Sequence, residues 1–281
     1  MNHREDFFEG VAGLRLYRQS WLPGGRPRAV VVIAHGAGEH SGRYAHVAQR
    51  LADEGYAVYA LDHRGHGRSE GPRAVIDRID NAVADLERLI VLAGSEQPGM
   101  PLFLLGHSMG ATIAVRYAIA HQDRLAGLIL SAPLAALEAA SPPTRLVARL
   151  LSALVPHLPL FAVDPTLVSR DPDVVKAYET DPLVHHGRLP ARTIAELARA
   201  VDSLPQEVRA ITVPTLIMYG SGDHLVPPAG SMMLNDRIGA ADMTLNTYDG
   251  LYHEIFNEPE QDEVMDDMCS WLRARVKATV A

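Results

Sequence analysis

The most constraining feature of this chain is a serine in a glycine-flanked turn between an apolar run and a helix-like run. Residues 101–105 (PLFLL) are apolar throughout, as in a strand that is buried on both faces of a sheet. The turn at 106–110 (GHSMG) follows, and alanine- and valine-rich sequence with helical character continues to His121. Glycines on both sides of Ser108 permit a strained turn that side chains would obstruct. A G-x-S-x-G pattern between a strand and a helix is typical of a serine nucleophile, and the first amides of the helix would point toward charge developing on it.

Strand-like and helix-like segments alternate on both sides of this turn. Residues 7–21 predict a leading antiparallel hairpin. Apolar, strand-like runs occur at 29–34, 56–61, 126–131, 213–220 and 243–248. Helix-like segments occur at 44–54, 80–93, 229–237 and 259–277. The alternation predicts an α/β fold with a mostly parallel sheet and helices on both faces.

The alternation is interrupted between residues 133 and 205. This stretch predicts several helical pieces broken by prolines, including an amphipathic helix at 144–155, and no strand. About seventy residues is long for a connection inside a compact domain. The sequence therefore predicts a core made of residues 1–132 and 206–281, with residues 133–205 inserted as a helical cap.

Charge and cysteine content exclude several classes of function. The formal net charge of −8 argues against a nucleic-acid partner, because phosphate binding depends on clustered Lys and Arg. Cys269 is the only cysteine, so neither an internal disulfide nor a cysteine-based metal site can form. The first residues lack the pattern of a signal peptide, and the least charged stretch, 150–163, is too short to span a bilayer. We therefore expect a soluble, cytoplasmic protein.

The serine hydroxyl needs a base to take its proton and an acid to orient that base. In sheets of this kind both come from loops at the carboxyl ends of later strands, in the order acid, histidine. Asp223 follows the 213–220 strand and His253 follows the 243–248 strand, so they are the predicted acid and base for Ser108. Alone, each would be explained as well by a turn, a helix cap or a solvent-exposed loop residue. Their nearest rivals are His224 and Asp249.

Two backbone amides are candidates for stabilising the oxyanion of the tetrahedral intermediate. One is the amide of Met109, which follows the serine, and the other is that of Ala37, in the glycine-containing loop after the 29–34 strand. His35, Glu39 and His40 in that loop resemble a metal-binding cluster. No matching ligands occur elsewhere, so we expect them to shape the loop by hydrogen bonds, and we expect no metal. His63 and His66 are likewise interpreted as turn-forming.

Taken together, six motifs resemble those of the monoacylglycerol lipases of the α/β-hydrolase superfamily, with the bacterial enzymes most similar. The motifs are HGAGEH at 35–40, DHRGHGRS at 62–69, GHSMG at 106–110, DPLVHHG at 181–187, GD at 222–223 and GLYHE at 250–254. The resemblance covers nearly the whole chain. It implies an eight-stranded sheet, a helical cap over the active site, no cofactor, and hydrolysis of monoglycerides to glycerol and fatty acid.

Carried over residue by residue, the resemblance assigns Ser108 as nucleophile, Asp223 as acid and His253 as base. It places the oxyanion hole at the amides of Ala37 and Met109. None of these positions departs from the family pattern.

The predicted cap supports a lipid substrate only indirectly. Its apolar residues could line an acyl pocket or touch a membrane or other lipid surface transiently, and packing of the cap onto the sheet explains them equally well. The candidate acyl-pocket residues are Leu150, Leu154, Leu158 and Phe161. A lysophospholipase or a short-chain carboxylesterase would use the same triad, and an acyltransferase would result if an alcohol replaced water. A non-catalytic binding protein is disfavoured because all three triad residues are present.

Overall fold

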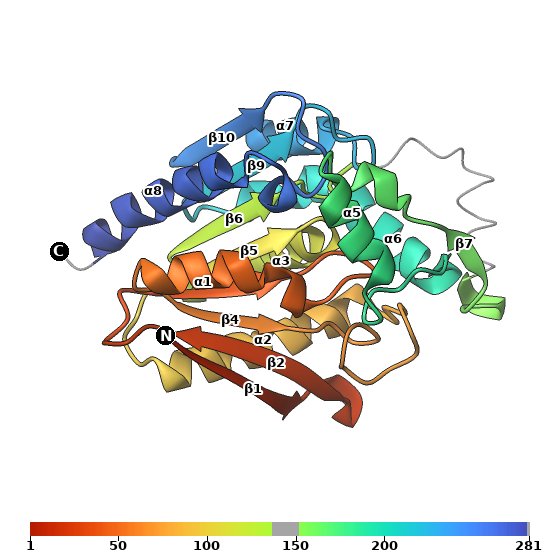
Figure 1. Ribbon diagram of the computed structural model, residues 1–281, viewed down its shortest axis with the longest axis horizontal. Coiled ribbons are helices and arrows are strands. Elements are labelled where there is room, and N and C mark those ends of the chain that lie inside the picture. Colours follow the sequence, from red (N-terminus) through yellow and green to blue (C-terminus); the bar gives the residue numbers. More distant parts are fainter. Residues whose placement is uncertain (137–151, 280–281) are drawn as a thin grey trace.

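The computed structural model describes residues 1–136 and 152–279, and Figure 1 shows their arrangement. A central sheet carries helices on both of its faces, and a further group of elements lies at one edge. Leu150 and most of the predicted helix at 144–155 lie outside the described residues.

The sheet has eight strands in the order β1-β2-β4-β3-β5-β6-β9-β10. The pairs β1–β2 and β2–β4 are antiparallel, and all other neighbours are parallel, which confirms the predicted leading hairpin and mostly parallel sheet. The strands are β1 (Asn2–Glu9), β2 (Arg15–Leu22), β3 (Val30–Ala34), β4 (Ala57–Leu61), β5 (Leu102–His107), β6 (Gly127–Ser131), β9 (Thr215–Gly220) and β10 (Met243–Tyr248).

The central strands are buried on both faces, which explains their unbroken apolar sequences. Every residue of β3 is buried, and its side chains alternate between two separate hydrophobic clusters. Val30 and Val32 pack with one group of helices, whereas Val31 and Ile33 pack with the other. The first group is α2 (Ile79–Glu96), α3 (Met109–His121), α6 (Ala191–Glu207) and α7 (Ala229–Arg237), and the second is α1 (Ala45–Asp53) and α8 (Gln261–Thr279).

The segment between β6 and β9 contains more than helices. It holds α5 (Pro172–Thr180) and α6, but also two short strands, β7 (Pro159–Phe161) and β8 (Leu189–Pro190), which pair antiparallel. The expectation that this stretch has no strand is therefore wrong. Strands of three and two residues with prolines at their ends are too short to show an alternating pattern. Helix α6 also runs past Pro205, where the cap was predicted to end.

The parallel strands bring the predicted site residues to one edge of the sheet. The loops that follow β3, β5, β9 and β10 all leave the carboxyl ends of parallel neighbours, where such sheets place their ligand sites.

On the α8 side, Cys269 is fully buried in the hydrophobic cluster, and burial raises the pKa of its thiol to about 11. Within the described ranges, no helix has the length and apolar content needed to cross a lipid bilayer.

Candidate active site

Ser108 lies in a strained turn between β5 and α3. Its φ of 53° and ψ of −118° are unusual for a residue with a side chain, and such strain concentrates at functional sites. The flanking glycines are required by contact with backbone atoms. A Cβ on Gly106 would lie 2.6 Å from the Cα of Ala111, and one on Gly110 would lie 2.1 Å from the carbonyl oxygen of Ala34.

The structure brings Asp223 and His253 together. Nδ1 of His253 donates a hydrogen bond to Oδ2 of Asp223 at 2.7 Å, which leaves Nε2 of the imidazole free to act on a neighbouring group. The other carboxylate oxygen of Asp223 accepts from the backbone amides of Leu225 and Val226, at 2.8 and 2.9 Å. Both carboxylate oxygens of Asp223 therefore accept hydrogen bonds, which fix the orientation of the side chain.

The rival residues make other contacts, although His224 also lines the cavity that contains Ser108. The side chain of His224 is exposed, and its ring packs edge-on against Tyr252 at 5.5 Å between ring centres. Asp249 accepts a hydrogen bond from the hydroxyl of Ser221 at the surface. Neither arrangement suits an acid or base for Ser108.

The electrostatics of the pair favour the charged form of each partner. Burial of Asp223 would raise its pKa, but the charge and hydrogen bond of His253 and the two amides lower it below its usual value. Burial of His253 opposes its protonation, but the charge and hydrogen bond of Asp223, with smaller effects of Glu254 and Glu39, raise the pKa of His253 above its usual value.

The loop after β3 lies beside the serine and carries an unpaired amide. A Cβ on Gly36 would lie 3.3 Å from the Cβ of Ser108, so the two backbones approach closely. Among the residues that the structure describes, no acceptor pairs with the amides of Ala37 or Met109. Two free donors at this position could stabilise a developing oxyanion.

The histidines near this loop are buried and bonded to backbone. His35 donates from Nδ1 to the carbonyl oxygen of Gly36 at 2.7 Å and accepts at Nε2 from the amide of His63 at 2.9 Å. His66 donates from Nδ1 to the carbonyl oxygen of Arg64. Burial lowers the pKa of His35 and of His66 to about 3. Both nitrogens of the His35 ring are thus committed to holding the loop.

A buried ion cluster under the site was missed by the sequence reasoning. Arg43 donates to Glu39 at 3.1 Å and, through two nitrogens, to Glu254 at 2.5 and 2.7 Å. Burial would raise the pKa of Glu254, but Arg43 lowers it. The pKa of Glu39 is raised by burial and by the charge of Glu254. Both glutamates lie inside the motifs quoted above, but only the structure shows that they pair with Arg43.

A cavity of about 560 Å³ opens above these residues. Ser108 and His253 contribute to it, and most of its wall is apolar. The apolar lining residues are Ala37, Leu134, Phe161, Ala162, Val163, Leu167, Val168, Leu189, Ile194, Leu197, Leu225, Val226 and Pro227.

Of the four candidate acyl-pocket residues, the structure brings one to the cavity. Phe161 lines it, although its side chain is 48% exposed. Leu154 and Leu158 are 77% and 38% exposed and are not among the lining residues. Leu150 lies outside the described residues.

Comparison with known proteins gives the family. Residues 25–260 match the family described as "Serine aminopeptidase, S33". The chain is 46% identical to the monoacylglycerol lipase of Mycolicibacterium smegmatis, over 95% of this chain and 96% of that protein. The chain belongs to the monoacylglycerol lipase family. Another member, the human monoglyceride lipase, is 36% identical over 94% of this chain and 88% of its own.

Solved structures of monoacylglycerol lipases share the fold. The enzyme of Paleococcus ferrophilus superposes with a TM-score of 0.83 at 34% identity, covering 92% of this chain and 99% of that one. A soluble variant of the Saccharomyces cerevisiae monoglyceride lipase, in complex with a substrate analog, gives a TM-score of 0.86 at 26% identity, covering 96% and 94%. The resemblance drawn from the sequence motifs and the α/β-hydrolase fold are both confirmed.

Proposed function

We propose that this protein hydrolyses monoacylglycerols to glycerol and free fatty acid through an acyl-enzyme on Ser108. One observation carries the proposal: a histidine that is hydrogen-bonded at 2.7 Å to a buried carboxylate shares an apolar cavity with a serine in a strained turn. Membership of the monoacylglycerol lipase family supports the substrate.

In the acylation step, Oγ of Ser108 attacks the ester carbonyl carbon while Nε2 of His253 takes the hydroxyl proton. Asp223 keeps the imidazole in the tautomer with hydrogen on Nδ1 and stabilises the imidazolium that forms. The amides of Ala37 and Met109 donate to the oxyanion. When the tetrahedral intermediate collapses, the bond to the glycerol oxygen breaks and His253 protonates that oxygen.

In the deacylation step, His253 takes a proton from water as the water oxygen attacks the acyl carbonyl carbon. The second tetrahedral intermediate is stabilised by the same two amides. Its collapse breaks the bond to Ser108 Oγ, which recovers its proton from His253, and releases the fatty acid.

We further propose that residues 133–205 act as a cap that binds the acyl chain and approaches lipid. The apolar cavity wall contributed by residues 161–197 suits an acyl chain. Leu154, Val155, Leu158 and Phe161 are large apolar residues that are 38–77% exposed. Exposed apolar residues close to one another in sequence favour transient contact with a lipid surface. Leu150 is placed in the same acyl-binding role by the sequence alone.

The test is hydrolysis of a monoacylglycerol chain-length series against diolein, triolein, lysophosphatidylcholine and short p-nitrophenyl esters. We expect rapid turnover of monoacylglycerols and little of the other lipids. Ser108→Ala should fold normally and lower the rate by roughly 10⁴- to 10⁶-fold. Co-sedimentation of the Ser108→Ala protein with phosphatidylcholine vesicles tests the lipid contact without turnover.

Other outcomes identify the alternatives. Preference for lysophosphatidylcholine would make the protein a lysophospholipase, and cleavage of p-nitrophenyl esters alone would make it a short-chain carboxylesterase. A Ser108→Ala protein that kept the wild-type rate would remove the serine mechanism altogether.

A further inference from the structure

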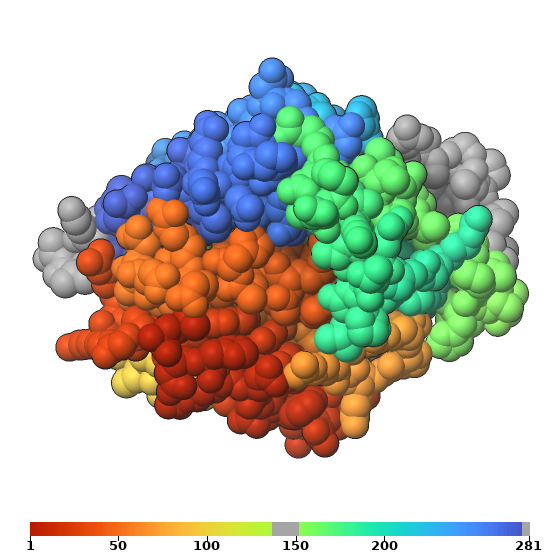
Figure 2. Space-filling view, viewed as in Figure 1, coloured from red at the N-terminus to blue at the C-terminus, as the bar shows by residue number. Residues whose placement is uncertain are grey.

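Helix α5 lies between the two loops that carry the proposed chemistry. We call residues 35–40 the oxyanion loop and residues 252–258 the base loop. Figure 2 shows the green segment that contains α5 against both the orange part of the chain, just after the oxyanion loop, and the blue C-terminal part. Each end of this segment contacts one of the loops.

The C-terminal end of α5 holds the oxyanion loop. The amide of His185 donates to the carbonyl oxygen of Gly38 at 2.7 Å. Nδ1 of His40 accepts from the amide of Gly42, so the proton of the neutral ring is on Nε2, which donates to Oδ2 of Asp181 at 2.9 Å. The other oxygen of Asp181 accepts from the amide of Leu183 and closes the turn that presents His185.

These contacts fix the backbone on both sides of the Ala37 amide. On one side, the amide of Gly36 donates to Glu39, within the loop itself. On the other, Gly38 has a φ of 80°, a conformation that side chains rarely adopt, and its carbonyl group is held by His185. The second anchor therefore comes from a residue almost 150 positions further along the chain.

The N-terminal end of α5 holds the base loop in a similar way. The carbonyl oxygen of Val168 accepts from the amide of Glu254 at 2.8 Å, immediately after His253. The hydroxyl of Ser169 donates to the carbonyl oxygen of Asn257 at 2.9 Å. Arg170 donates to the buried Glu258 at 2.9 Å, and Glu258 accepts from the amide of Tyr252, immediately before His253.

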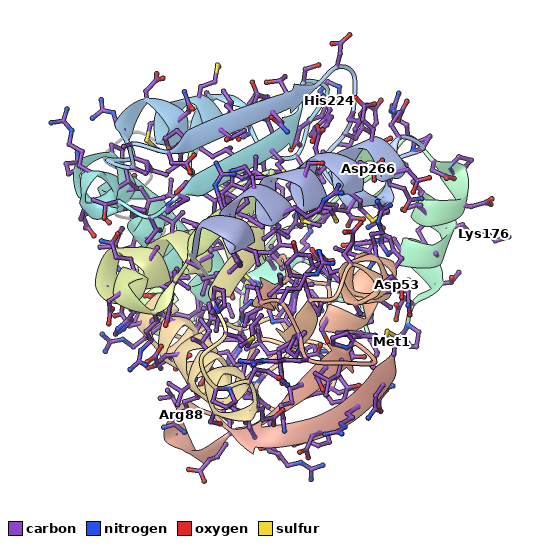
Figure 3. The ribbon with its side chains drawn as sticks, turned by 90° about the vertical axis from the view of Figure 1, so that its left-hand side faces the viewer. Met1, Asp53, Arg88, Lys176, His224 and Asp266 are labelled. Carbon is purple, nitrogen blue, oxygen red and sulfur yellow. The ribbon has the colours of Figure 1, made fainter. Side chains whose placement is uncertain are left out.

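The helix between these anchors is stabilised by a cap at its first turn and by a buried side chain near its end. Asp171 caps its first turn by accepting from the amide of Asp173. Tyr178 is buried and packs over the guanidinium of Arg43 at 4.8 Å, and Arg43 itself bonds to Glu39 and Glu254. Lys176, on the outer face, points away from the molecule (Figure 3). A nine-residue helix is about 13 Å long, so the two anchors are well separated.

We propose that α5 is a strut that sets the distance and orientation between the oxyanion loop and the base loop, with Asp181 and Ser169 as positioning residues at its two ends. The proposal rests on the serine-esterase mechanism above. It goes beyond acyl binding, because it makes this part of the predicted cap responsible for the geometry around the reacting carbonyl group.

The test is a double-mutant cycle between the two ends. Asp181→Asn keeps an oxygen for the amide of Leu183 but places an NH₂ group opposite the Nε2–H of His40, which breaks that contact. Ser169→Ala removes the bond to Asn257 and the bond that its hydroxyl accepts from the amide of Asp171, without leaving a buried charge unpaired. The measurements are kcat and KM for p-nitrophenyl butyrate and the inhibition constant of an alkyl boronic acid, whose adduct with the serine is tetrahedral.

We expect each single variant to lower kcat and weaken boronic-acid inhibition about tenfold, with KM within about twofold of wild type. A misplacement of 1 Å can cost about 100-fold in rate, so this is a modest displacement. Independent sites this far apart have additive free energies, and their fold-losses multiply. Release of either end should free the strut, so the double variant should also lose about tenfold rather than about 100-fold.

Asp173→Asn is the matched control, because it removes the same charge from the exposed face of the same helix and should change nothing. His40→Ala breaks the Asp181 contact from the other side and replaces Asp181→Asn if that variant does not fold. Multiplied losses in the double variant, a change in KM alone, or single variants equal to wild type would each overturn the proposal. Wild-type cleavage of the p-nitrophenyl ester without cleavage of monoacylglycerols would remove the substrate assignment and leave the strut testable.

Discussion

The protonation of His253 depends on carboxylates from three loops. Asp223 follows β9 and bonds to the ring, Glu254 is the next residue along, and Glu39 comes from the loop after β3. In the proposed mechanism the ring must be neutral to accept a proton from Ser108, so a raised pKa moves the loss of activity toward neutral pH. We therefore expect the acid limb of the kcat/KM profile above about 6.5, the ordinary value for histidine.

Asp223→Asn should shift this limb. Removing the charge lowers the pKa of His253, so the limb should move to lower pH even as the rate falls by about 10⁴-fold through loss of the correct tautomer. The measurement is kcat/KM for p-nitrophenyl butyrate between pH 5 and pH 9. Asp249→Asn, which alters a surface carboxylate bonded to Ser221, should leave the profile in place. An unmoved limb in Asp223→Asn would show that another group controls the base.

At the level of the elements, the contact between α3 and β3 determines how the serine turn is held. Gly110, in the first turn of α3, lies against the backbone of β3, and an added Cβ would meet the carbonyl oxygens of Ala34 at 2.1 Å and His35 at 2.5 Å. Neither oxygen can move without displacing the strand or the start of the oxyanion loop. The glycine is thus required by the packing of the helix against the strand.

Gly110→Ala should therefore force α3 away from β3. We expect a loss of about 1–3 kcal/mol in the free energy of unfolding, as for other overpacked sites, together with a large loss of activity. Gly94→Ala is the matched control, since Gly94 lies in α2 with nothing within 4 Å of an added Cβ. That variant should gain about 0.5–1 kcal/mol by helix propensity. Urea unfolding of both proteins measures the difference, and equal stabilities would contradict the packing argument.

The sequence predicted those helices, strands and turns whose own residues carry a recognisable pattern. β3 and β4 are continuous apolar runs because both faces are covered, and the serine turn carries glycines because backbone atoms crowd it. Asp223 and His253 were found because chain order and strand ends fix where an acid and a base can lie. The roles of the triad and the oxyanion amides remain predictions that their geometry supports.

The features that the sequence did not predict depend on contacts between distant residues, and such contacts leave no periodic pattern in the chain. Arg43 meets Glu254 across 211 positions, and His40 meets Asp181 across 141. Nothing in the local sequence at either partner encodes such a pairing. The short strands β7 and β8 were missed for a related reason, because two or three residues cannot display a period. What the sequence did not predict therefore consists of contacts between distant loops of the core, and of contacts and short strands in the segment between β6 and β9.

At the level of the whole molecule, four buried histidines should make stability depend on pH. Burial lowers the pKa of His35, His66 and His107 to about 3 and holds that of His63 well below its usual range. In the unfolded chain each would titrate near 6.5. As the pH falls below 6.5, the unfolded state gains protons that the folded state does not, so stability present above that pH is progressively lost.

The free energy of unfolding should therefore fall steeply between pH 6.5 and pH 4. Each histidine that stays neutral contributes a loss of about 1.4 kcal/mol per pH unit, and the opposite shift of His253 offsets part of the total. Urea unfolding across this range gives the number of protons taken up. His66→Gln should reduce that number by about one, whereas His157→Gln, at an exposed position, should not. Equal proton uptake in all three proteins would mean that these buried rings do not control the acid response.

The buried thiol of Cys269 provides a way to measure how fast the native protein unfolds around it. It is the only sulfhydryl in the chain, it lies in the hydrophobic cluster that α1 and α8 form with the sheet, and burial disfavours its reactive thiolate. A maleimide should therefore label the native protein only as fast as α8 leaves the sheet, and each molecule should gain one label. The labelling rate would then report kinetic stability, and a boronic acid bound at Ser108 should slow it only if it stabilises the protein globally.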